Sequence, residues 1–172
     1  MLVSLMDLDR AVVIALGANL SGPAGAPQHA LEAALDQLTA AGLVVVRRSR
    51  WWRSRAWPDP AQPDYLNGVA LVETSLTADQ TLEALHAIEA AAGRERRELN
   101  EPRILDLDLI ACGREIRREP AIAIPHPRAA DRLFVMGPLA EIAPDWRHPI
   151  TGETAQALAE RATIGTDAAP LD

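Results

Sequence analysis

The chain has 172 residues, of which 48% are hydrophobic and 24% are charged, and its formal net charge at pH 7 is -7. This composition is typical of a globular domain, and it excludes intrinsic disorder as a description of the whole chain. No apolar run reaches the roughly 20 residues that a membrane-spanning helix needs, and the acidic balance argues against a general binder of nucleic acid or anionic membranes.

The first part of the chain alternates apolar runs with helical periodicity. The apolar run at residues 11–16 stops at a glycine and predicts a buried strand. Residues 27–41 carry apolar side chains three and four positions apart, which predicts a helix that ends at Gly42. A second, increasingly basic strand is expected over residues 43–52. Residues 54–64 contain three prolines and no periodicity, so we expect a loop there.

The second part begins with a weakly alternating segment at residues 65–74, which predicts a third strand. Thr77 has the capping-box spacing to Gln80, and the helix it starts is expected to reach about Ala92. A fourth strand is expected over residues 103–112. Shorter elements follow: an extended segment at 121–125, a helix that starts near 128 and lies before Pro138, a helix at 155–162, and a frayed tail at 163–172.

Together these elements predict a single α+β domain over residues 1–172, in which helices pack on one sheet. Residues 1–10 and 163–172 are expected to lie at its periphery. The chain has one cysteine, Cys112, which cannot form an internal disulfide. A lone cysteine fits a reducing compartment, so we expect a cytoplasmic protein.

The strongest chemical signal lies in the predicted strand at residues 103–112. Because side chains alternate between the two faces of a strand, its leucines point one way and Asp106 and Asp108 the other. Two adjacent carboxylates on a mostly apolar strand repel each other and lose solvation unless a cation compensates them. A magnesium ion held partly by substrate phosphates would do so. The alternative is a half-exposed strand that carries two solvated acids.

Arginines gather in two islands, of which the first contains no acidic residue. All 17 basic residues are arginines; five lie in residues 47–57 and four in residues 94–103. Guanidinium groups beside a carboxylate pair are typical of phosphoryl-transfer sites, where metal and arginine share the phosphate charge. The islands therefore predict a local anion site. The alternative for the second island is a solvated loop in which Glu95, Glu98 and Glu101 pair with the arginines.

Six segments, in order and spacing, carry a resemblance to a known family. They are Ala15-Leu16-Gly17-Ala18-Asn19-Leu20; Gln62-Pro63-Asp64-Tyr65-Leu66-Asn67; Glu89 with Gly93-Arg94; Pro102-Arg103-Ile104-Leu105-Asp106-Leu107-Asp108; Pro125-His126-Pro127; and Arg132-Leu133-Phe134-Val135 with Pro138-Leu139. Over residues 12–149 the chain resembles the 6-hydroxymethyl-7,8-dihydropterin pyrophosphokinases of folate biosynthesis. The resemblance implies an α+β fold with a ferredoxin-like sheet, additional strands, and helices packed on the sheet.

The resemblance also implies a reaction. The hydroxymethyl oxygen of the pterin attacks the β-phosphorus of ATP, a pyrophosphoryl group is transferred, and AMP leaves. The enzyme would then be a magnesium-dependent diphosphotransferase (kinase) with ATP as co-substrate and two bound Mg2+ ions. Its partners would be small molecules, without nucleic acid or membrane, and the protein would be a monomer.

Site residues follow from the same resemblance. Asp106 and Asp108 would hold the magnesium ions and, with Arg94 and Arg103, form the catalytic group. The residues expected to contact ATP are Glu89, Arg94, Arg96, Arg103, His126 and Arg132, with Glu89 near the sugar. Those expected to contact the pterin are Ser54, Tyr65, Asn67 and Phe134, with Tyr65 and Phe134 on the two faces of the ring. Asn19 is expected to support the loop that precedes Tyr65.

The chain departs from the family pattern in two loops. Ser54-Arg55 stands where the family commonly has Thr-Pro, and Leu99-Asn100 where many members have Arg-Trp. Trp57 is the candidate to replace the missing tryptophan. The basic segments 48–64 and 94–101 are expected to close over bound ATP.

Two other functions are compatible with parts of the pattern. Another metal-dependent phosphoryl enzyme, such as a phosphodiesterase, could use the aspartate pair without any affinity for a pterin. A non-catalytic RNA-binding module on a similar sheet would need several aromatic residues on adjacent strands and a basic face. The few aromatic residues and the acidic charge disfavour this module.

Overall fold

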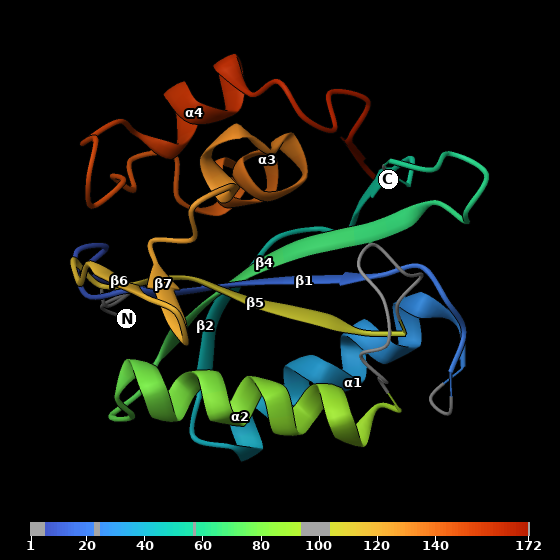
Figure 1. The fold of residues 1–172 in the computed structure, drawn as a ribbon, viewed down its shortest axis with the longest axis horizontal. Coiled ribbons are helices and arrows are strands. Elements are labelled where there is room, and N and C mark those ends of the chain that lie inside the picture. Colours follow the sequence, from blue (N-terminus) through green and yellow to red (C-terminus); the bar gives the residue numbers. More distant parts are fainter. Residues whose placement is uncertain (1–5, 23–24, 57, 94–103, 172) are drawn as a thin grey trace, which may run out of the picture.

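A computed structural model describes residues 6–22, 25–56, 58–93 and 104–171. A six-stranded sheet forms its centre (Figure 1). The strands β5 (Asp106–Cys112), β1 (Val12–Ala18) and β4 (Tyr65–Glu73) lie side by side and antiparallel. Along the other edge of β4 lie β2 (Val44–Arg48) and then β3 (Trp52–Ser54), and β3 pairs in turn with β8 (Ala169–Pro170).

Helices cover both faces of this sheet. Figure 1 shows α1 (Pro27–Ala40) and α2 (Ala78–Ala91) on one face, and α3 (Leu133–Ile142) and α4 (Ala155–Arg161) on the other. The order β5-β1-β4-β2, with α1 after β1 and α2 after β4, is the ferredoxin-like arrangement. The predicted α+β fold with added strands is therefore confirmed. Among the described helices, none has the length and hydrophobicity to cross a membrane.

The added elements extend the ferredoxin-like unit on both sides. They are the strands β3 and β8, the hairpin of β6 (Arg117–Glu119) and β7 (Ile122–Ile124), a 3-10 turn (Ala129–Asp131), and the helices α3 and α4. The helix α2 begins with the predicted capping box: the Thr77 hydroxyl accepts from the Gln80 amide and the Gln80 side chain accepts from the Thr77 amide. This box satisfies two amides that the first helical turn leaves without partners.

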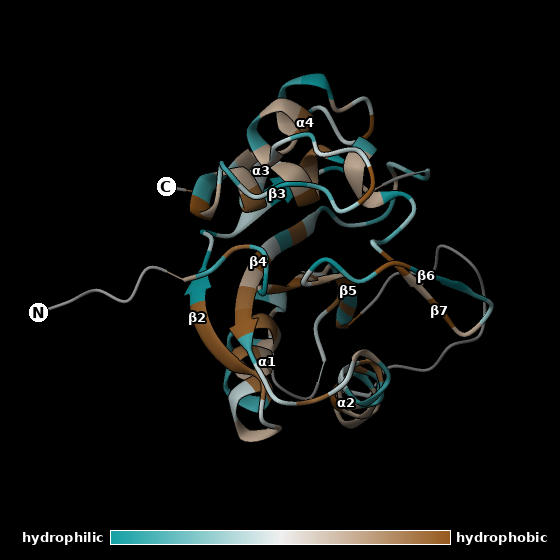
Figure 2. Cartoon of the chain, turned by 90° about the vertical axis from the view of Figure 1, so that its left-hand side faces the viewer, coloured by the Kyte–Doolittle hydropathy of each residue, from teal (hydrophilic) through white to brown (hydrophobic). Residues whose placement is uncertain are grey.

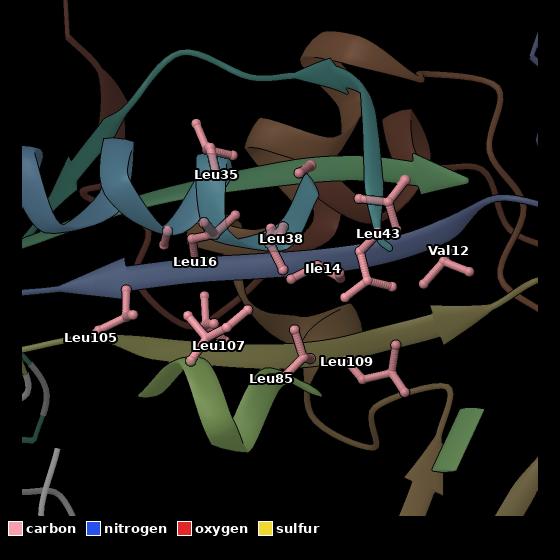
Figure 3. Close-up of a cluster of buried hydrophobic side chains, with 14 of the residues drawn as sticks. Val12, Ile14, Leu16, Leu35, Leu38, Leu43, Leu85, Leu105, Leu107 and Leu109 are labelled. Atoms are coloured by element: carbon pink, nitrogen blue, oxygen red, sulfur yellow. The ribbon is translucent and has the colours of Figure 1, made fainter. Parts of the chain in front are cut away.

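Two hydrophobic cores hold the layers together, one on each face of the sheet. The core beneath α1 and α2 takes alternate residues of β1 and β5, including Ile14, Leu16, Leu107 and Leu109 (Figure 3). The core beneath α3 and α4 takes Val13 and Ala15 of β1 and is completed by large side chains such as Met136, Leu139 and Trp146. Because alternate positions face opposite layers, β1 and most of β4 are buried on both sides.

The predicted strand at residues 43–52 is interrupted in the structure. Figure 2 shows β2 changing from hydrophobic to hydrophilic along its length, as its valines give way to arginines. The chain then leaves regular pairing at Ser49, whose hydroxyl accepts the amide of Val69 on β4 at 3.0 Å. A serine side chain here takes a hydrogen bond that a continuous strand would make with its backbone, and pairing resumes at β3.

The end of the chain also differs from the expectation. Instead of a helix that starts near 128 and stops before Pro138, the structure has the 3-10 turn and then α3, which continues through Pro138 to Ile142. Residues 163–171 do not fray: β8 pairs with β3, and the Leu171 amide donates to the Trp51 carbonyl at 2.8 Å. The contacts of residues 169–171 with residues 51–53 join segments more than a hundred residues apart, and local sequence patterns do not reveal them.

A buried histidine in the turn before α4 predicts a pH dependence of stability. The Nδ1 atom of His148 accepts the amides of Ile150 and Thr151 at 3.2 and 3.4 Å. Burial lowers the pKa of His148 from its ordinary 6.5, against the opposing effect of Glu153. His148 therefore binds a proton more readily in the unfolded chain than in the folded one. Its contribution to the free energy of unfolding is complete above about pH 6.5 and decreases as the pH drops toward the lowered pKa of the folded state.

The variant His148→Asn offers a matched test of this dependence. The Oδ1 atom of asparagine occupies a place similar to Nδ1, so it can still accept the two amides, but it does not titrate. We expect the difference in melting temperature between pH 7.5 and pH 5.5, measured by circular dichroism, to shrink in the variant. An unchanged difference would assign the acid sensitivity to other groups.

Candidate functional site

A pocket of about 480 Å³ opens on the side of the sheet that α3 covers. Its lining combines carboxylates, arginines, two aromatic side chains and small residues. The lining residues are Ala15, Leu16, Gly17, Ser54, Arg55, Tyr65, Asn67, Asp106, Asp108, Arg128, Asp131, Arg132, Phe134, Val135 and Ile164. The pocket thus brings together seven of the predicted site residues: Ser54, Tyr65, Asn67, Asp106, Asp108, Arg132 and Phe134.

The floor of the pocket is made by the three central strands. In the sheet register, Gly17 on β1 lies between Asn67 on β4 and Asp106 on β5, and Ala15 lies beside Asp108. A Cβ atom at Gly17 would lie 3.0 Å from the Asn67 Oδ1 atom. The small residues of β1 therefore leave open the space between an amide and a pair of carboxylates.

The predicted alternation along β5 is confirmed. Leu105, Leu107 and Leu109 are buried in the core beneath α1 and α2, and Figure 3 shows them on the β5 side of that core. Asp106 and Asp108 point to the other face and line the pocket. Both are half-buried, which is the setting in which a carboxylate pair needs a compensating charge.

Glu89 lies on the opposite side of β5 from the pocket. It is 2% exposed on α2, and its Oε2 atom accepts the Leu107 amide at 3.4 Å. Because β5 is the edge strand of the sheet here, this carboxylate supplies an acceptor that a neighbouring strand would otherwise provide. Glu89 thereby braces the strand between the two aspartates. Its expected contact with the nucleotide sugar stays a prediction.

The composition of the pocket fits a magnesium ion bound together with a phosphate substrate. Within the described ranges, no group of three or more His, Cys, Asp or Glu side chains is placed to hold a metal ion on its own. A site with two protein carboxylates suits magnesium, which keeps several waters and takes substrate phosphates as ligands. Asp106 and Asp108 are the residues that would hold it.

The pocket lining also combines two aromatic side chains with a buried polar pair. Tyr65 comes from the start of β4, and Phe134 comes from the first turn of α3, which covers the sheet. The Asn67 amide donates to the Ser54 hydroxyl at 3.1 Å, and both residues are less than 10% exposed. This arrangement can bind a flat ring with polar atoms at its edge.

The loop before Tyr65 is tied down by a buried asparagine, as predicted. The Asn19 side chain donates to the Pro63 carbonyl at 3.1 Å, and Asn19 is 3% exposed. The loop after β1 therefore holds the loop before β4 in place.

His126 lies next to the pocket rather than in its lining. Burial lowers its pKa, with Arg132 acting in the same direction and Asp106 against both. Its Nδ1 atom accepts the Arg128 amide at 3.2 Å, so the neutral ring carries its proton on Nε2.

Three of the five arginines of the first island bind groups of the fold itself, and the anion site expected there stays a prediction. Arg47 donates to the Ile142 carbonyl, Arg48 to Glu32 and Arg50 to Glu141, at 2.8 to 3.0 Å. Of this island only Arg55 lines the pocket. Arg48 ends β2 and residues 52–54 form β3, so strands occupy part of the segment 48–64, and its closure over ATP stays a prediction. Arg94, Arg96, Arg103, Trp57 and residues 94–101 lie outside the described residues.

Three lining residues lie outside the motif segments and arginine islands that the sequence singled out: Arg128, Asp131 and Ile164. Arg128 and Asp131 lie between the motif residues His126 and Arg132, so their position in that segment was an available signal. Ile164 had none, since it belongs to the stretch expected to fray.

The chain is similar to known proteins of one family. The family model described as 7,8-dihydro-6-hydroxymethylpterin-pyrophosphokinase (HPPK) matches residues 13–144. A relative from Synechocystis named 2-amino-4-hydroxy-6-hydroxymethyldihydropteridine pyrophosphokinase is 44% identical over 150 residues, covering 87% of this chain and 74% of the relative. One of the same name from Pseudomonas aeruginosa is 40% identical over 138 residues, covering 80% and 83%.

Solved structures show the same fold. Wild-type HPPK-DHPS of Plasmodium falciparum superposes with a TM-score of 0.67 at 13% identity, covering 87% of this chain. An HPPK-DHPS in complex with substrates gives a TM-score of 0.68 at 11% identity, covering 88%. This chain spans 44% and 43% of those longer chains.

The family match covers most of the sheet and the segments that line the pocket up to α3. The chain belongs to the 7,8-dihydro-6-hydroxymethylpterin-pyrophosphokinase family, enzymes of folate biosynthesis that transfer pyrophosphate from ATP to the hydroxymethyl group of the dihydropterin.

Proposed function

We propose that this chain carries out the reaction of its family in the described pocket, with the residues placed as follows. Tyr65 and Phe134 hold the faces of the dihydropterin ring, and Asn67 and Ser54 bind its polar edge. Asp106 and Asp108 hold magnesium beside the triphosphate of ATP. The observation that supports this most is that one pocket combines a carboxylate pair with two aromatic side chains and a buried amide.

Positioning accounts for most of the catalysis in this proposal. The ring site and the carboxylate site share the floor made by Ala15 and Gly17, so the pterin hydroxymethyl group is presented to the triphosphate. The hydroxymethyl oxygen bonds to the β-phosphorus and loses its proton, the bond from that phosphorus to the bridging oxygen of AMP breaks, and AMP leaves. Holding both substrates in line replaces a bimolecular encounter.

Charge neutralisation accounts for the rest. Magnesium, when bound, would offset the negative charge that builds up on the phosphate oxygens. Arg132 lines the pocket beside Phe134 and can bind a phosphate oxygen through its guanidinium group. His126 can donate from Nε2 to the same substrate. Arg94, Arg96 and Arg103 complete the proposed phosphate contacts, and Glu89 the proposed contact near the sugar.

Three finer points belong to the same proposal. The resemblance supports two magnesium ions per active site, one domain acting as a monomer, and a cytoplasmic location. The half-buried Cys112 agrees with a reducing compartment, because burial raises the pKa of its thiol and so keeps the thiol protonated and unreactive.

The proposed function is tested by measuring AMP production from ATP with and without 6-hydroxymethyl-7,8-dihydropterin and magnesium. We expect AMP to form only when all three are present, and calorimetric titration to show pterin binding that an ATP analogue with magnesium strengthens. A phosphodiesterase that used the same aspartates would show no pterin affinity. Release of AMP that does not depend on the pterin would contradict the proposal.

A substitution at the floor tests the shared site directly. In Gly17→Ala the added methyl group would press against Asn67, whose amide is held by Ser54. We expect pterin affinity to fall several-fold while the affinity for the ATP analogue alone changes less, both measured by calorimetry. Gly42→Ala is not a suitable control, because Gly42 has a φ of +90°; Ala40→Gly on the exposed end of α1 serves instead. Unchanged pterin affinity would place the ring away from Gly17.

A further inference from the structure

The segment after α4 contacts the wall of the pocket that carries Phe134. The Asp131 carbonyl accepts the amides of Thr163 and Ile164 at 3.0 and 2.9 Å, and the Leu133 amide donates to the Ile164 carbonyl at 2.9 Å. A Cβ atom at Gly165 would lie 2.4 Å from the Phe134 Cδ1 atom, so the backbone lies directly against the ring. Ile164 itself lines the pocket.

The same segment then contacts the wall that carries Ser54. The Asp167 Oδ2 atom accepts the Arg55 amide at 2.8 Å. Residues 169 and 170 pair with β3, and the Leu171 amide donates to the Trp51 carbonyl. Residues 163–171, which we name the C-terminal strap, therefore join the two walls of the pocket.

We infer that the C-terminal strap sets the width of the ring site, and that Asp167 is a positioning residue for the pterin through the Arg55 amide. This inference rests on the proposed function, since it assumes that the ring lies between Tyr65 and Phe134. The strap lies wholly beyond residues 13–144, the stretch that the family model matches. It is therefore a feature of this chain that the family assignment does not supply.

Asp167 accepts the amide of a residue that adjoins the polar edge of the ring site. Arg55 directly follows Ser54, whose hydroxyl accepts from Asn67 on the pocket floor. A carboxylate that accepts a backbone amide makes a charge-assisted hydrogen bond, which is stronger than a neutral one. Without the Asp167 carboxylate, the Arg55 amide would donate its hydrogen bond to water instead. Ser54 could then move relative to Asn67. The ring would then meet a less ordered polar edge.

The first test compares Asp167→Ala with Thr166→Ala, its exposed neighbour, as a matched control. We expect pterin affinity, titrated in the presence of magnesium and an ATP analogue, to fall about fivefold in Asp167→Ala and to stay unchanged in the control. In steady-state assays KM for the pterin should rise, with kcat and KM for ATP changing little. Asp167→Asn, which keeps an acceptor oxygen, should restore part of the affinity.

A double-mutant cycle separates positioning from general destabilisation. Arg55→Pro removes the amide hydrogen to which Asp167 is bonded, because proline has no N–H. If Asp167 acts through that amide, Asp167→Ala should cause no further loss of pterin affinity in the Arg55→Pro background. Additive losses, or an equal loss of affinity for pterin and for the ATP analogue, would overturn the inference.

Pterin binding by the unaltered chain distinguishes failure of the proposed function from failure of the role inferred for Asp167. Normal pterin binding by the unaltered chain and by Asp167→Ala alike would overturn the inference alone. Absence of pterin binding by the unaltered chain would overturn the proposed function and the inference with it.

Discussion

Replacing either Asp106 or Asp108 with asparagine is expected to remove nearly all turnover while leaving the fold intact. Each exchange keeps the volume of the side chain and removes one charged ligand from the pocket lining. Substitutions of residues that only orient metal ligands typically cost tenfold to about a hundredfold in metal affinity or activity. Loss of a ligand itself should therefore lower kcat by more than about a hundredfold.

The measurement is steady-state AMP production at saturating pterin across a magnesium titration. Asp36→Asn, on the exposed side of α1, is the matched control and should behave as the unaltered chain. Circular dichroism melts check that each variant is folded. Activity within a few-fold of the parent at any magnesium concentration would refute the metal assignment.

The aspartate site was predictable because alternation along a strand is a local property. An apolar strand in which Leu105, Leu107 and Leu109 must be buried leaves Asp106 and Asp108 no place but the other face. The structure adds which residue lies on the neighbouring strands beside the two aspartates. Only the pairing of β1 with both β4 and β5 brings Asn67 to the same floor, and the register of three strands cannot be obtained from any one of them.

The elements that escaped prediction depend on contacts between distant segments. Nothing in residues 163–172 has the length or periodicity of a strand, yet two of them pair with β3 and one lines the pocket. The first arginine island illustrates the same limit. A basic run predicts an anion site only if its charges are not already compensated, and Glu32 on α1 and Glu141 on α3 compensate Arg48 and Arg50. Glu32 is 16 residues from Arg48 and Glu141 is 91 residues from Arg50, so neither pair is visible in the basic run itself.

Substituting alanine for Tyr65 or for Phe134 is expected to weaken pterin binding by about fivefold to tenfold each. A stacked aromatic contact contributes on the order of 1 kcal/mol beyond the area it buries, which corresponds to several-fold in affinity. Tyr65→Phe keeps the ring and should bind the pterin nearly as the parent does. Phe134→Leu keeps much of the volume without the aromatic face and should lie between the parent and alanine.

The substitutions at Tyr65 and Phe134 should differ in their effect on binding of an ATP analogue. The Arg132 guanidinium lies over the Phe134 ring at 5.7 Å from its centroid, a distance at which the ring stabilises the cation. Phe134→Ala should therefore also weaken binding of an ATP analogue slightly, whereas Tyr65→Ala should leave it unchanged. Calorimetry of each ligand alone and of both together separates these effects. If Tyr65→Ala weakened both ligands equally, the loss would reflect destabilisation of β4, and the ring would have to be bound elsewhere.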